Sequence, residues 1–462
     1  MRIVDVNEFY SPTGGGVRTY IDRKMGIMSE LGHELIVIAA GRENLVEERP
    51  GGGKIIYVKA SRLPFDKNYG LFWDAAPVTS LLDELKPDLV EASSPWRPAW
   101  IVGQWQQKRG QEDAAKVFFM HNDNVAAYAL RWFEGLAAQD RIERAFAWYS
   151  RYMSRFLDNY DAVVTNGPAL EKRLKARGVR IDAAMPLGIE RGHFSPDLRD
   201  ETLRTALLAQ CDLPPNGHLL LGLGRHHPEK RWRLVIDAVE RAGSSLPVGL
   251  VLLGTGIESR TIEKRIAGSP HIRMFRPVYD RERLARIVAS CDALIHGSEA
   301  EPFGLVASEA MAAGLPLIAP ETGGCAEIAD PHCSELYTAR DAQSAALAIH
   351  RLFARDPAIL RRAARVAAGK VRSDREHTIE LMDYYGGLVA ARRDGRRSNA
   401  VACRTPARRP HRMSFRCNRN GCIRYRVPFD IIPAFLANVE AADISDRARH
   451  KAPVFRVLMR GR

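Results

Sequence analysis

The strongest constraint on the fold is a regular alternation of short apolar runs with amphipathic, helix-like segments over residues 1–390. Such strand–helix–strand alternation produces right-handed crossovers and mostly parallel sheets that are buried on both faces. We therefore expect an α/β protein. Eleven apolar runs have the length and composition of strands, at 2–7, 34–40, 54–60, 88–93, 116–121, 161–166, 219–224, 249–254, 272–275, 293–297 and 316–320.

Eleven strands are more than a single open sheet usually contains, so the pattern predicts two doubly wound, Rossmann-like domains. The boundary between the two domains lies near "MPLGIERGHFSPDLRDETLR", where glycines and prolines interrupt the periodicity. We place the first domain at 1–190 and the second at 191–374. Doubly wound domains bind ligands at the carboxyl ends of their strands, which predicts a site in the cleft between the two.

The net charge of +13 is concentrated at the end of the chain. Residues 391–462 hold 18 Lys and Arg against 5 Asp and Glu, whereas residues 1–390 hold 50 of each sign. The globular part therefore has no net positive field to attract nucleic acid, and no specific nucleic-acid partner is expected. The basic tail at 393–462 is predicted to be disordered. It is either an arm for nucleic acid or anionic membranes or, as we favour, an appended segment without a fold.

Cysteine usage and the N-terminus indicate a reducing, cytoplasmic compartment. The seven cysteines form no CxxC pair, which argues against a zinc site or a disulfide framework, so we predict no metal ligands. No basic leader with an apolar run opens the chain, and no apolar stretch is long enough to span a membrane. The segment 140–157 carries an apolar stripe opposite an arginine stripe. We interpret it as a core-packed helix with a solvated basic face; peripheral contact with the inner face of a membrane is the alternative.

Three glycines, at 14–16 in "SPTGGGVRTY", follow the first strand and open a helix. Glycines let the backbone approach a ligand closely, and a helix N-terminus favours an anion. The spacing is not GxGxxG, so a nicotinamide dinucleotide is poorly supported. Taken alone, these glycines are about as often turn residues.

Two cations follow the strand at 219–224, in "LLLGLGRHHPEKRW". Arg225 offers a planar fork for phosphate oxygens, and Lys230 offers a compact point charge. Together they can neutralise a diphosphate, including the charge that grows as it leaves. The alternative is a pair of solvated surface charges.

Two carboxylates, Glu301 and Glu309, flank a predicted helix start near Phe303 in "SEAEPFGLVASEAMAAG". Free amides between Phe303 and Val306 would face an anion or hydroxyl oxygens. One carboxylate can accept hydrogen bonds from sugar hydroxyls and the other from a ribose diol. The alternative is a glutamate favoured by the helix dipole together with an unrelated surface glutamate.

These motifs together resemble retaining glycosyltransferases of family 4, which have the GT-B fold. "EPFGLVASE" is similar to the E-x7-E motif of that family, "GRHHPEK" to its diphosphate segment and "GGGVRTY" to its glycine loop. The resemblance covers about residues 1–392. It implies an acceptor-side first domain, a nucleotide-sugar-binding second domain, and a helix at 375–392 that crosses back to the first.

The resemblance also implies a role for each matching residue. Glu301 would hold the hydroxyls of the donor sugar and Glu309 the ribose, while Arg225 and Lys230 would bind the diphosphate. The remaining matches are His121, near the sugar and reaction centre; Gly15 and Gly16, approaching the diphosphate across the cleft; and the amides of Phe303, Gly304 and Leu305. His121, Arg225, Lys230 and Glu301 form the catalytic set.

The implied reaction moves a hexose from a nucleotide diphosphate sugar to an acceptor hydroxyl with retention of anomeric configuration. The acceptor would be a sugar, a lipid-linked sugar or a lipid, in the synthesis of cell-envelope polysaccharide, glycolipid or another glycoconjugate. The donor is a co-substrate, and neither a cofactor nor a metal is expected. Two alternatives are a GT-B-fold nucleotide-sugar epimerase and a nucleic-acid-binding protein that acts through its basic tail.

Overall fold

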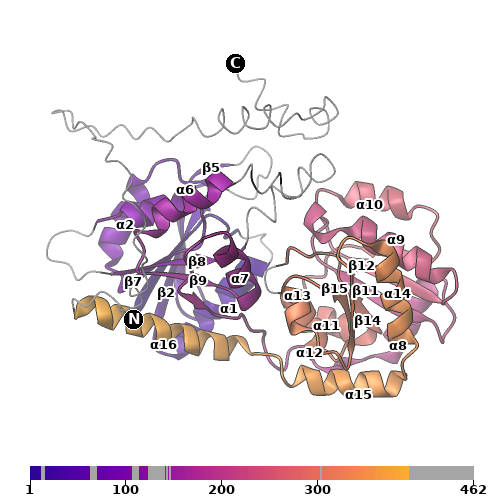
Figure 1. Ribbon diagram of the computed structural model, residues 1–462. Helices are drawn as coiled ribbons and strands as arrows, with labels where there is room; N and C mark the ends of the chain where they lie inside the picture. Colours follow the sequence, from indigo (N-terminus) through magenta and orange to yellow (C-terminus); the bar gives the residue numbers. More distant parts are fainter. Residues whose placement is uncertain are drawn as a thin grey trace.

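The computed structural model describes residues 1–11, 16–62, 70–106, 114–122, 141, 144, 147–301 and 304–394. These residues form two α/β lobes, each built on a sheet (Figure 1). The first sheet runs in the order β10-β9-β8-β7-β1-β2-β4-β3, and its neighbouring strands are parallel except for β3 and β4. Its strands are β1 (Arg2–Asn7), β2 (Glu34–Gly41), β3 (Leu45–Glu48), β4 (Lys54–Lys59), β7 (Leu89–Ala92), β8 (Ala115–Met120), β9 (Ala162–Thr165) and β10 (Ala183–Ala184).

The second sheet runs in the order β13-β12-β11-β14-β15-β16 and is parallel throughout. A separate two-stranded ribbon pairs β5 (Ser61–Arg62) with β6 (Gly70–Leu71). The strands of the second sheet are β11 (His218–Leu223), β12 (Val248–Leu253), β13 (Ile272–Phe275), β14 (Ala293–Ile295), β15 (Leu317–Pro320) and β16 (Ser334–Tyr337).

Both sheets are covered on two faces, which explains why their strands are apolar almost without interruption. Val4 and Val6 of β1 belong to one core cluster, and Ile3, the residue before Val4, belongs to the cluster on the opposite face. Leu220 of β11 faces the other way from Leu219 and Leu221 in the same manner. Successive strand residues point to opposite faces, so each strand joins two cores and each lobe has three layers.

Helices form the outer layers (Figure 1). Those of the first lobe are α1 (Gly16–Glu30), α2 (Ala76–Leu85), α3 (Arg97–Gln104), α6 (Ala147–Leu157) and α7 (Pro168–Ala176). Those of the second lobe are α8 (Glu201–Gln210), α9 (Trp232–Gly243), α10 (Ser259–Ile266), α11 (Arg281–Ser290), α12 (Leu305–Ala312), α13 (Gly324–Ile328), α14 (Ala342–Phe353) and α15 (Pro357–Ala368), with 3-10 turns at Pro196–Leu198 and Pro228–Lys230.

The two doubly wound domains predicted from the sequence are confirmed, and all eleven predicted strands are present with ends shifted by at most two residues. The prediction missed the edge strands β3, β10 and β16. β3 is largely exposed and β10 has only two residues, so neither carries an apolar run. In β16 the sequence "SELY" places two polar residues in a four-residue strand.

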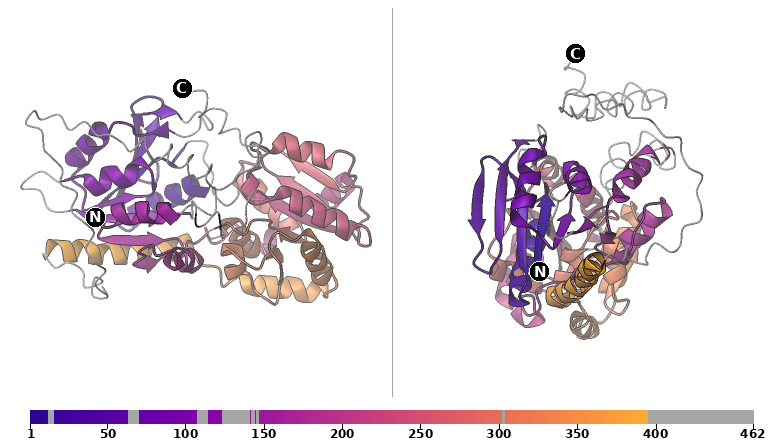
Figure 2. Two further views of the ribbon diagram at one scale, coloured as in Figure 1. Left: turned by 45° about the horizontal axis from the view of Figure 1, so that its top comes forward. Right: turned by 90° about the vertical axis from the view of Figure 1, so that its left-hand side faces the viewer.

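The chain crosses between the lobes twice, and the two crossing segments pair with each other. The amide of Ile189 donates to the carbonyl of Arg372 at 3.0 Å, and the amide of Asp374 donates to the carbonyl of Ile189 at 2.9 Å. Helix α16 (Asp374–Arg393) then begins with a capping box formed by Ser373 and Glu376. It runs back along the first lobe (Figure 2) and packs against α1.

Helix α6 covers part of the segment predicted as a helix at 140–157. Met153 and Phe156 are buried in the first core, whereas Arg151 and Arg155 are exposed, as expected for a core-packed helix with a solvated basic face. Within the described residues, no helix combines the length and apolarity needed to cross a bilayer. The basic tail from residue 395 onward lies outside the described residues.

Candidate active site

The topology of the second sheet favours a ligand site between two neighbouring strands. From β11 the chain moves outward through β12 and β13, then returns to the other side of β11 as β14. In open parallel sheets, ligands bind at the carboxyl ends of the strands where the strand order reverses in this way. The segments after β11 and β14 carry Arg225, Lys230 and Glu301, so three predicted residues flank this switch point.

The segment after β11 holds Lys230 in place and leaves Arg225 more exposed. The indole Nε1 of Trp232 donates to the carbonyl of Arg225 at 2.9 Å, which fixes the turn. Lys230 closes the 3-10 turn with a side chain that is 9% exposed, and its Nζ forms an ion pair with Oε2 of Glu301. The Arg225 guanidinium is 56% exposed and pairs with Glu229 at 2.9 Å.

Glu301 is ionised despite its surroundings. Burial would raise its pKa, but the charge of Lys230 and the proximity of His296 outweigh burial and bring the pKa down to about 2. Its backbone carbonyl accepts from the amide of Gly324 at 2.8 Å, which ties the loop to α13. The side chain is 23% exposed, so this carboxylate is fixed, charged and still reachable by a ligand.

Helix α12 begins at Leu305, two residues later than the predicted start near Phe303. Gly304 is the N-cap, with a left-handed φ of 83° that disfavours residues with a side chain. A Cβ on Gly304 would also lie 3.0 Å from the Sγ of Cys325. The early start was wrong because a left-handed residue ends helical geometry. The free amides of the helix therefore begin at Leu305.

The two lobes meet where α1 and α12 begin. Gly16 is the first residue of α1, and a methyl group added to it would lie 3.9 Å from Cδ1 of Leu305. Leu305 packs against the core clusters of both lobes. Two helix N-termini, each with partial positive charge, thus converge from opposite lobes. Gly15 and Phe303, the neighbouring predicted residues, lie outside the described residues.

Glu309 lies at the domain boundary with partners of its own. Its Oε1 is 3.9 Å from Nη2 of Arg281, which also approaches Glu190 of the first crossing segment at 3.6 Å. Burial raises the pKa of Glu309, while Arg23 and Arg281 act in the opposite direction. Two glutamates eight positions apart therefore have distinct electrostatic environments.

His121 follows β8 in the first lobe and packs against Tyr20, with ring centroids 5.5 Å apart. Burial lowers its pKa to about 4, so the ring is neutral. The hydroxyl of Tyr20 bonds Nε2 of His377 at 3.0 Å, and Nδ1 of His377 donates to the carbonyl of Pro186 at 2.9 Å. His121 is thereby connected through Tyr20 to α16 and to the first crossing segment.

Beside His121, a cluster of charges is buried under the carboxyl edge of the first sheet. Lys24 and Glu91 pair at 2.7 Å, and the hydroxyl of Tyr385 donates to Glu91 at 2.6 Å. Ser93 donates to Asp5 at 2.9 Å and lies 3.1 Å from Glu91. Burial and the nearby Glu91 raise the pKa of Asp5 to about 7. These residues tie α1 and α16 to the sheet.

The structure therefore brings together two of the predicted pairs, Lys230 with Glu301 and Gly16 with Leu305. Within the described residues, no contact joins His121 or Glu309 to Lys230 or Glu301. Sequence reasoning missed His296, which lies between β14 and Glu301 and is 3% exposed. A histidine at the end of an apolar strand, two residues beyond Leu294 in "ALIHG", was the available signal.

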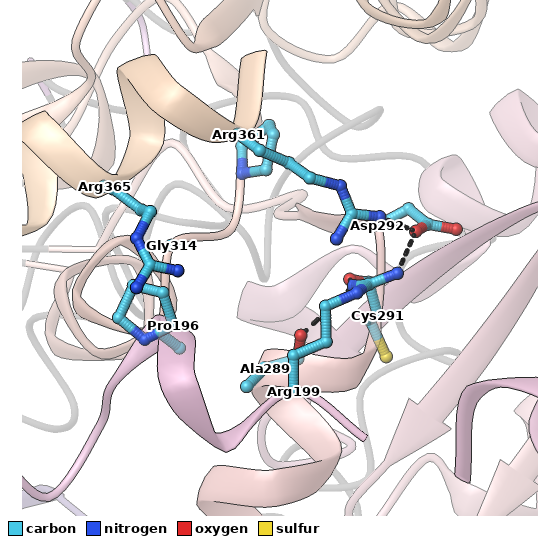
Figure 3. A pocket seen from close by; sticks show the side chains of 10 residues that line it. Pro196, Arg199, Ala289, Cys291, Asp292, Gly314, Arg361 and Arg365 are labelled. Carbon is cyan, nitrogen blue, oxygen red and sulfur yellow. Dashed lines mark hydrogen bonds and ion pairs between the residues drawn. The ribbon is translucent and has the colours of Figure 1, made fainter. Parts of the chain in front are cut away.

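One small pocket, with a volume of about 60 Å³, opens at the opposite, amino end of the second sheet (Figure 3). Arg199 and Arg361 both approach Asp292, at 3.1 and 3.4 Å, and Arg199 also donates to the carbonyls of Ala289 and Cys291. Arg365 pairs with Asp197. Its arginines thus hold the loops around β14 together, away from the residues discussed above.

Comparisons with known proteins assign the two lobes to glycosyltransferase families. Residues 14–183 match the family described as Glycosyltransferase Family 4, and residues 217–355 match the family described as Glycosyl transferases group 1. A D-inositol 3-phosphate glycosyltransferase of Mycobacteroides abscessus is 30% identical over 331 residues, which span 68% of this chain and 70% of that protein. The chain belongs to glycosyltransferase family 4.

Two further relatives agree with this assignment. A GDP-mannose-dependent alpha-(1-6)-phosphatidylinositol dimannoside mannosyltransferase of Mycobacterium tuberculosis is 28% identical over 329 residues, covering 71% of this chain and 81% of the relative. Sucrose-phosphate synthase from Thermosynechococcus elongatus has the same fold, with a TM-score of 0.68 at 21% identity over 85% of this chain and all of that one. The chain is thus a GT-B glycosyltransferase that uses a nucleotide sugar, and the epimerase alternative is not supported.

Proposed function

We propose that this enzyme transfers a mannosyl group from GDP-mannose to a hydroxyl of a phosphoinositide-type glycolipid. The observation that carries the site is the convergence of Lys230 and Glu301 at the β11–β14 switch point, beside the helix ends at Gly16 and Leu305. The choice of donor and acceptor is supported by the relatives, several of which are described as GDP-mannose-dependent mannosyltransferases.

In this proposal, the cationic side chains bind the diphosphate of the donor. Lys230 and Arg225 stand at the carboxyl end of β11, and the start of α12 faces the start of α1. A diphosphate between these groups would meet two side-chain charges and two helix N-termini. The same groups would stabilise the negative charge that develops as the nucleotide leaves. Gly15 and Gly16 would let the backbone of the first lobe come close.

The two carboxylates bind hydroxyl groups of the donor. Glu301 is ionised, so it would act as an acceptor for hydroxyls of the mannosyl group. Glu309 would accept hydrogen bonds from the ribose diol. The amides of Phe303, Gly304 and Leu305 would support the sugar and the diphosphate.

The chemical step is front-face attack. The bond between the anomeric carbon and the leaving phosphate oxygen breaks, while the acceptor oxygen bonds to the same face of that carbon. The proton of the acceptor hydroxyl moves to an oxygen of the leaving phosphate, so the balance requires neither a metal nor a cofactor. His121 would face the sugar from the first lobe as a neutral ring. Closure of the lobes would exclude water and limit donor hydrolysis.

A glycolipid acceptor implies that the enzyme works at a membrane surface. The proposal therefore includes peripheral contact between the membrane and the first lobe, which is the acceptor side. The protein should co-sediment with vesicles that contain the acceptor lipid, but not with vesicles of neutral phosphatidylcholine. Equal recovery with both would remove the membrane part of the proposal.

A thermal-shift screen tests the donor. GDP-mannose should raise the melting temperature more than UDP-glucose or ADP-glucose at equal concentration, because the ligand that binds the folded state more tightly stabilises it more. Radiolabelled mannose should then appear in phosphatidylinositol mannoside presented in mixed micelles, and chelation with EDTA should leave the rate unchanged. A larger shift with UDP-glucose, followed by transfer of glucose, would overturn the choice of donor.

A further inference from the structure

His296 is held rigidly at the end of β14, in the middle of the second sheet. The hydroxyl of Tyr337 donates to its backbone carbonyl at 2.6 Å. The amide of Ser298 donates to its ring Nδ1 at 3.2 Å. Because Nδ1 accepts a hydrogen bond, the neutral ring must carry its proton on Nε2. His296 therefore presents an N–H donor in a fixed direction.

That donor has an acceptor nearby but makes no bond to it. Nε2 is buried, has no hydrogen-bond partner among the described residues, and lies 3.8 Å from Oε2 of Glu301. The same oxygen is occupied by Lys230. Buried donors are normally paired, and one left without a partner is costly. A small movement of the Glu301 carboxylate toward the ring would satisfy it.

We propose that His296 is a positioning residue that holds Glu301 through its Nε2–H when the donor diphosphate draws Lys230 away from that carboxylate. This inference rests on the proposed function of Lys230 and Glu301. The exchange keeps the buried carboxylate hydrogen-bonded while its second oxygen accepts from a sugar hydroxyl. It also releases the lysine charge to the phosphates, where the reaction needs it.

The electrostatics of the site suit a neutral donor. The charged groups that act on His296 are Lys230, Glu301 and Glu229. Burial, followed by the positive charge of Lys230, lowers the pKa of His296 to about 4. The ring thus remains uncharged at neutral pH and does not compete with Lys230 for the diphosphate.

Two polar substitutions separate this role from a packing role. His296→Asn keeps an oxygen that can accept from Ser298 but removes the donor at the Nε2 position. His296→Gln can place an amide N–H near that position. We expect the Asn variant to lose about 10- to 100-fold in kcat, the range for a hydrogen bond to a charged group, and the Gln variant to recover most of it. GDP carries the same diphosphate and would also draw Lys230 away, so its affinity should fall in the Asn variant and recover in the Gln variant.

Glu301→Gln, alone and combined with His296→Asn, distinguishes failure of this inference from failure of the proposed function. If Glu301→Gln lowers kcat and His296→Asn adds nothing to it, the two residues act as one unit and the inference holds. Additive losses, or equal losses in the Asn and Gln variants, would overturn it. Unchanged turnover in Glu301→Gln would instead overturn the proposed role of Glu301 itself.

Discussion

Each lobe carries a lysine–glutamate pair at the carboxyl edge of its sheet, and the two pairs differ in how completely they are satisfied. In the first lobe, Lys24 is 2% and Glu91 0% exposed, and Glu91 also accepts from Tyr385. In the second lobe, Glu301 is 23% exposed and lies beside a buried imidazole donor that makes no bond. The chemistry of the pairs is alike, but their surroundings are not.

Under the proposed function, this difference separates a structural role from a ligand-binding role. The Lys24–Glu91 pair joins α1 and α16 to the sheet and has no exposed atom to offer a ligand. The Lys230–Glu301 pair lies at a switch point of the strand order, can be reached by a ligand, and retains hydrogen-bonding capacity. Loss of the first pair should therefore affect folding, and loss of the second should affect catalysis.

The largest effect is expected from Lys24→Met. The substitution removes the cation from a buried pair and leaves the Glu91 carboxylate without its charge partner. Breaking such a pair typically lowers the free energy of unfolding by about 3–5 kcal/mol. Chemical denaturation monitored by circular dichroism measures this loss. If Lys230→Met were equally destabilising, the contrast between the two pairs would be lost.

Lys230→Ala and Arg225→Ala should affect turnover instead. Removing one group that stabilises developing charge commonly lowers kcat by about 10²- to 10³-fold. Steady-state mannosyl transfer measures the loss, and a thermal melt confirms that the variants fold. Arg241→Ala, a change on the outer surface of α9, provides the matched control. Wild-type turnover in both site variants would remove them from the catalytic set.

The pH dependence of stability should differ between the lobes. His296 and His121 each have a folded pKa of about 4, below the ordinary value of 6.5, so the unfolded chain binds more protons in that window. Stability should be lost as pH falls from about 6.5 to about 4, by on the order of 3 kcal/mol for each histidine.

Asp5 opposes this trend in the first lobe. Its folded pKa of about 7 lies above the ordinary value of 3.8, so its contribution is present at low pH and is lost as pH rises toward 7. We therefore expect Asp5→Asn to show a steeper loss of stability on acidification than the wild type. Denaturant titrations at pH 4, 5, 6 and 7 measure the slope. A shallower slope in the variant would contradict the opposing signs.

Tyr385→Phe should produce a smaller effect. It removes the hydroxyl that donates to Glu91 at 2.6 Å and leaves the ring in place. A hydrogen bond to a buried charge is worth about 1.5–3 kcal/mol, so the melting temperature should fall by less than in Lys24→Met. Turnover at 25 °C should be unchanged. A fall in kcat without a fall in melting temperature would give this cluster a catalytic role.

The smallest effect on transfer is expected from trimming the chain after Arg393, where α16 ends. Mannosyl transfer should be unchanged, because the candidate site uses residues before that point. Any binding of the full chain to nucleic acid should disappear, measured by fluorescence anisotropy with a labelled duplex. Loss of transfer in the trimmed protein would show that the tail contributes to the site.

The fold could be predicted because its determinants are local. Runs such as "RIVDVN" and "VGLVLL" are buried on both sides, so their apolar character is continuous and their length is readable. β10 has only two residues, so it has no apolar run that could be recognised in the sequence. The start of α12 was predicted too early because the helix begins only after Gly304, which has a left-handed backbone conformation. A glycine in the sequence permits that conformation but does not require it.

The site could be predicted only in part because some of its partners are distant along the chain. Arg225 and Glu301 were proposed from their motifs, and the structure places both at the β11–β14 edge. The Lys24–Glu91 pair joins residues 67 positions apart and has no sequence pattern. His296 resembles any histidine at the end of a core strand. Only the bond from Ser298 fixes which nitrogen carries its proton and thus what it can do.

The most direct test of the central claim is a calorimetric titration of GDP-mannose into the wild type and into Lys230→Ala. Lys230 is assigned to the diphosphate, so the variant should bind at least about 10-fold more weakly, as expected when a charge-assisted bond is lost. Lys175→Ala, on the surface of α7, should bind as the wild type does. Equal affinity in the wild type and Lys230→Ala would contradict the assignment of the β11–β14 edge as the donor site.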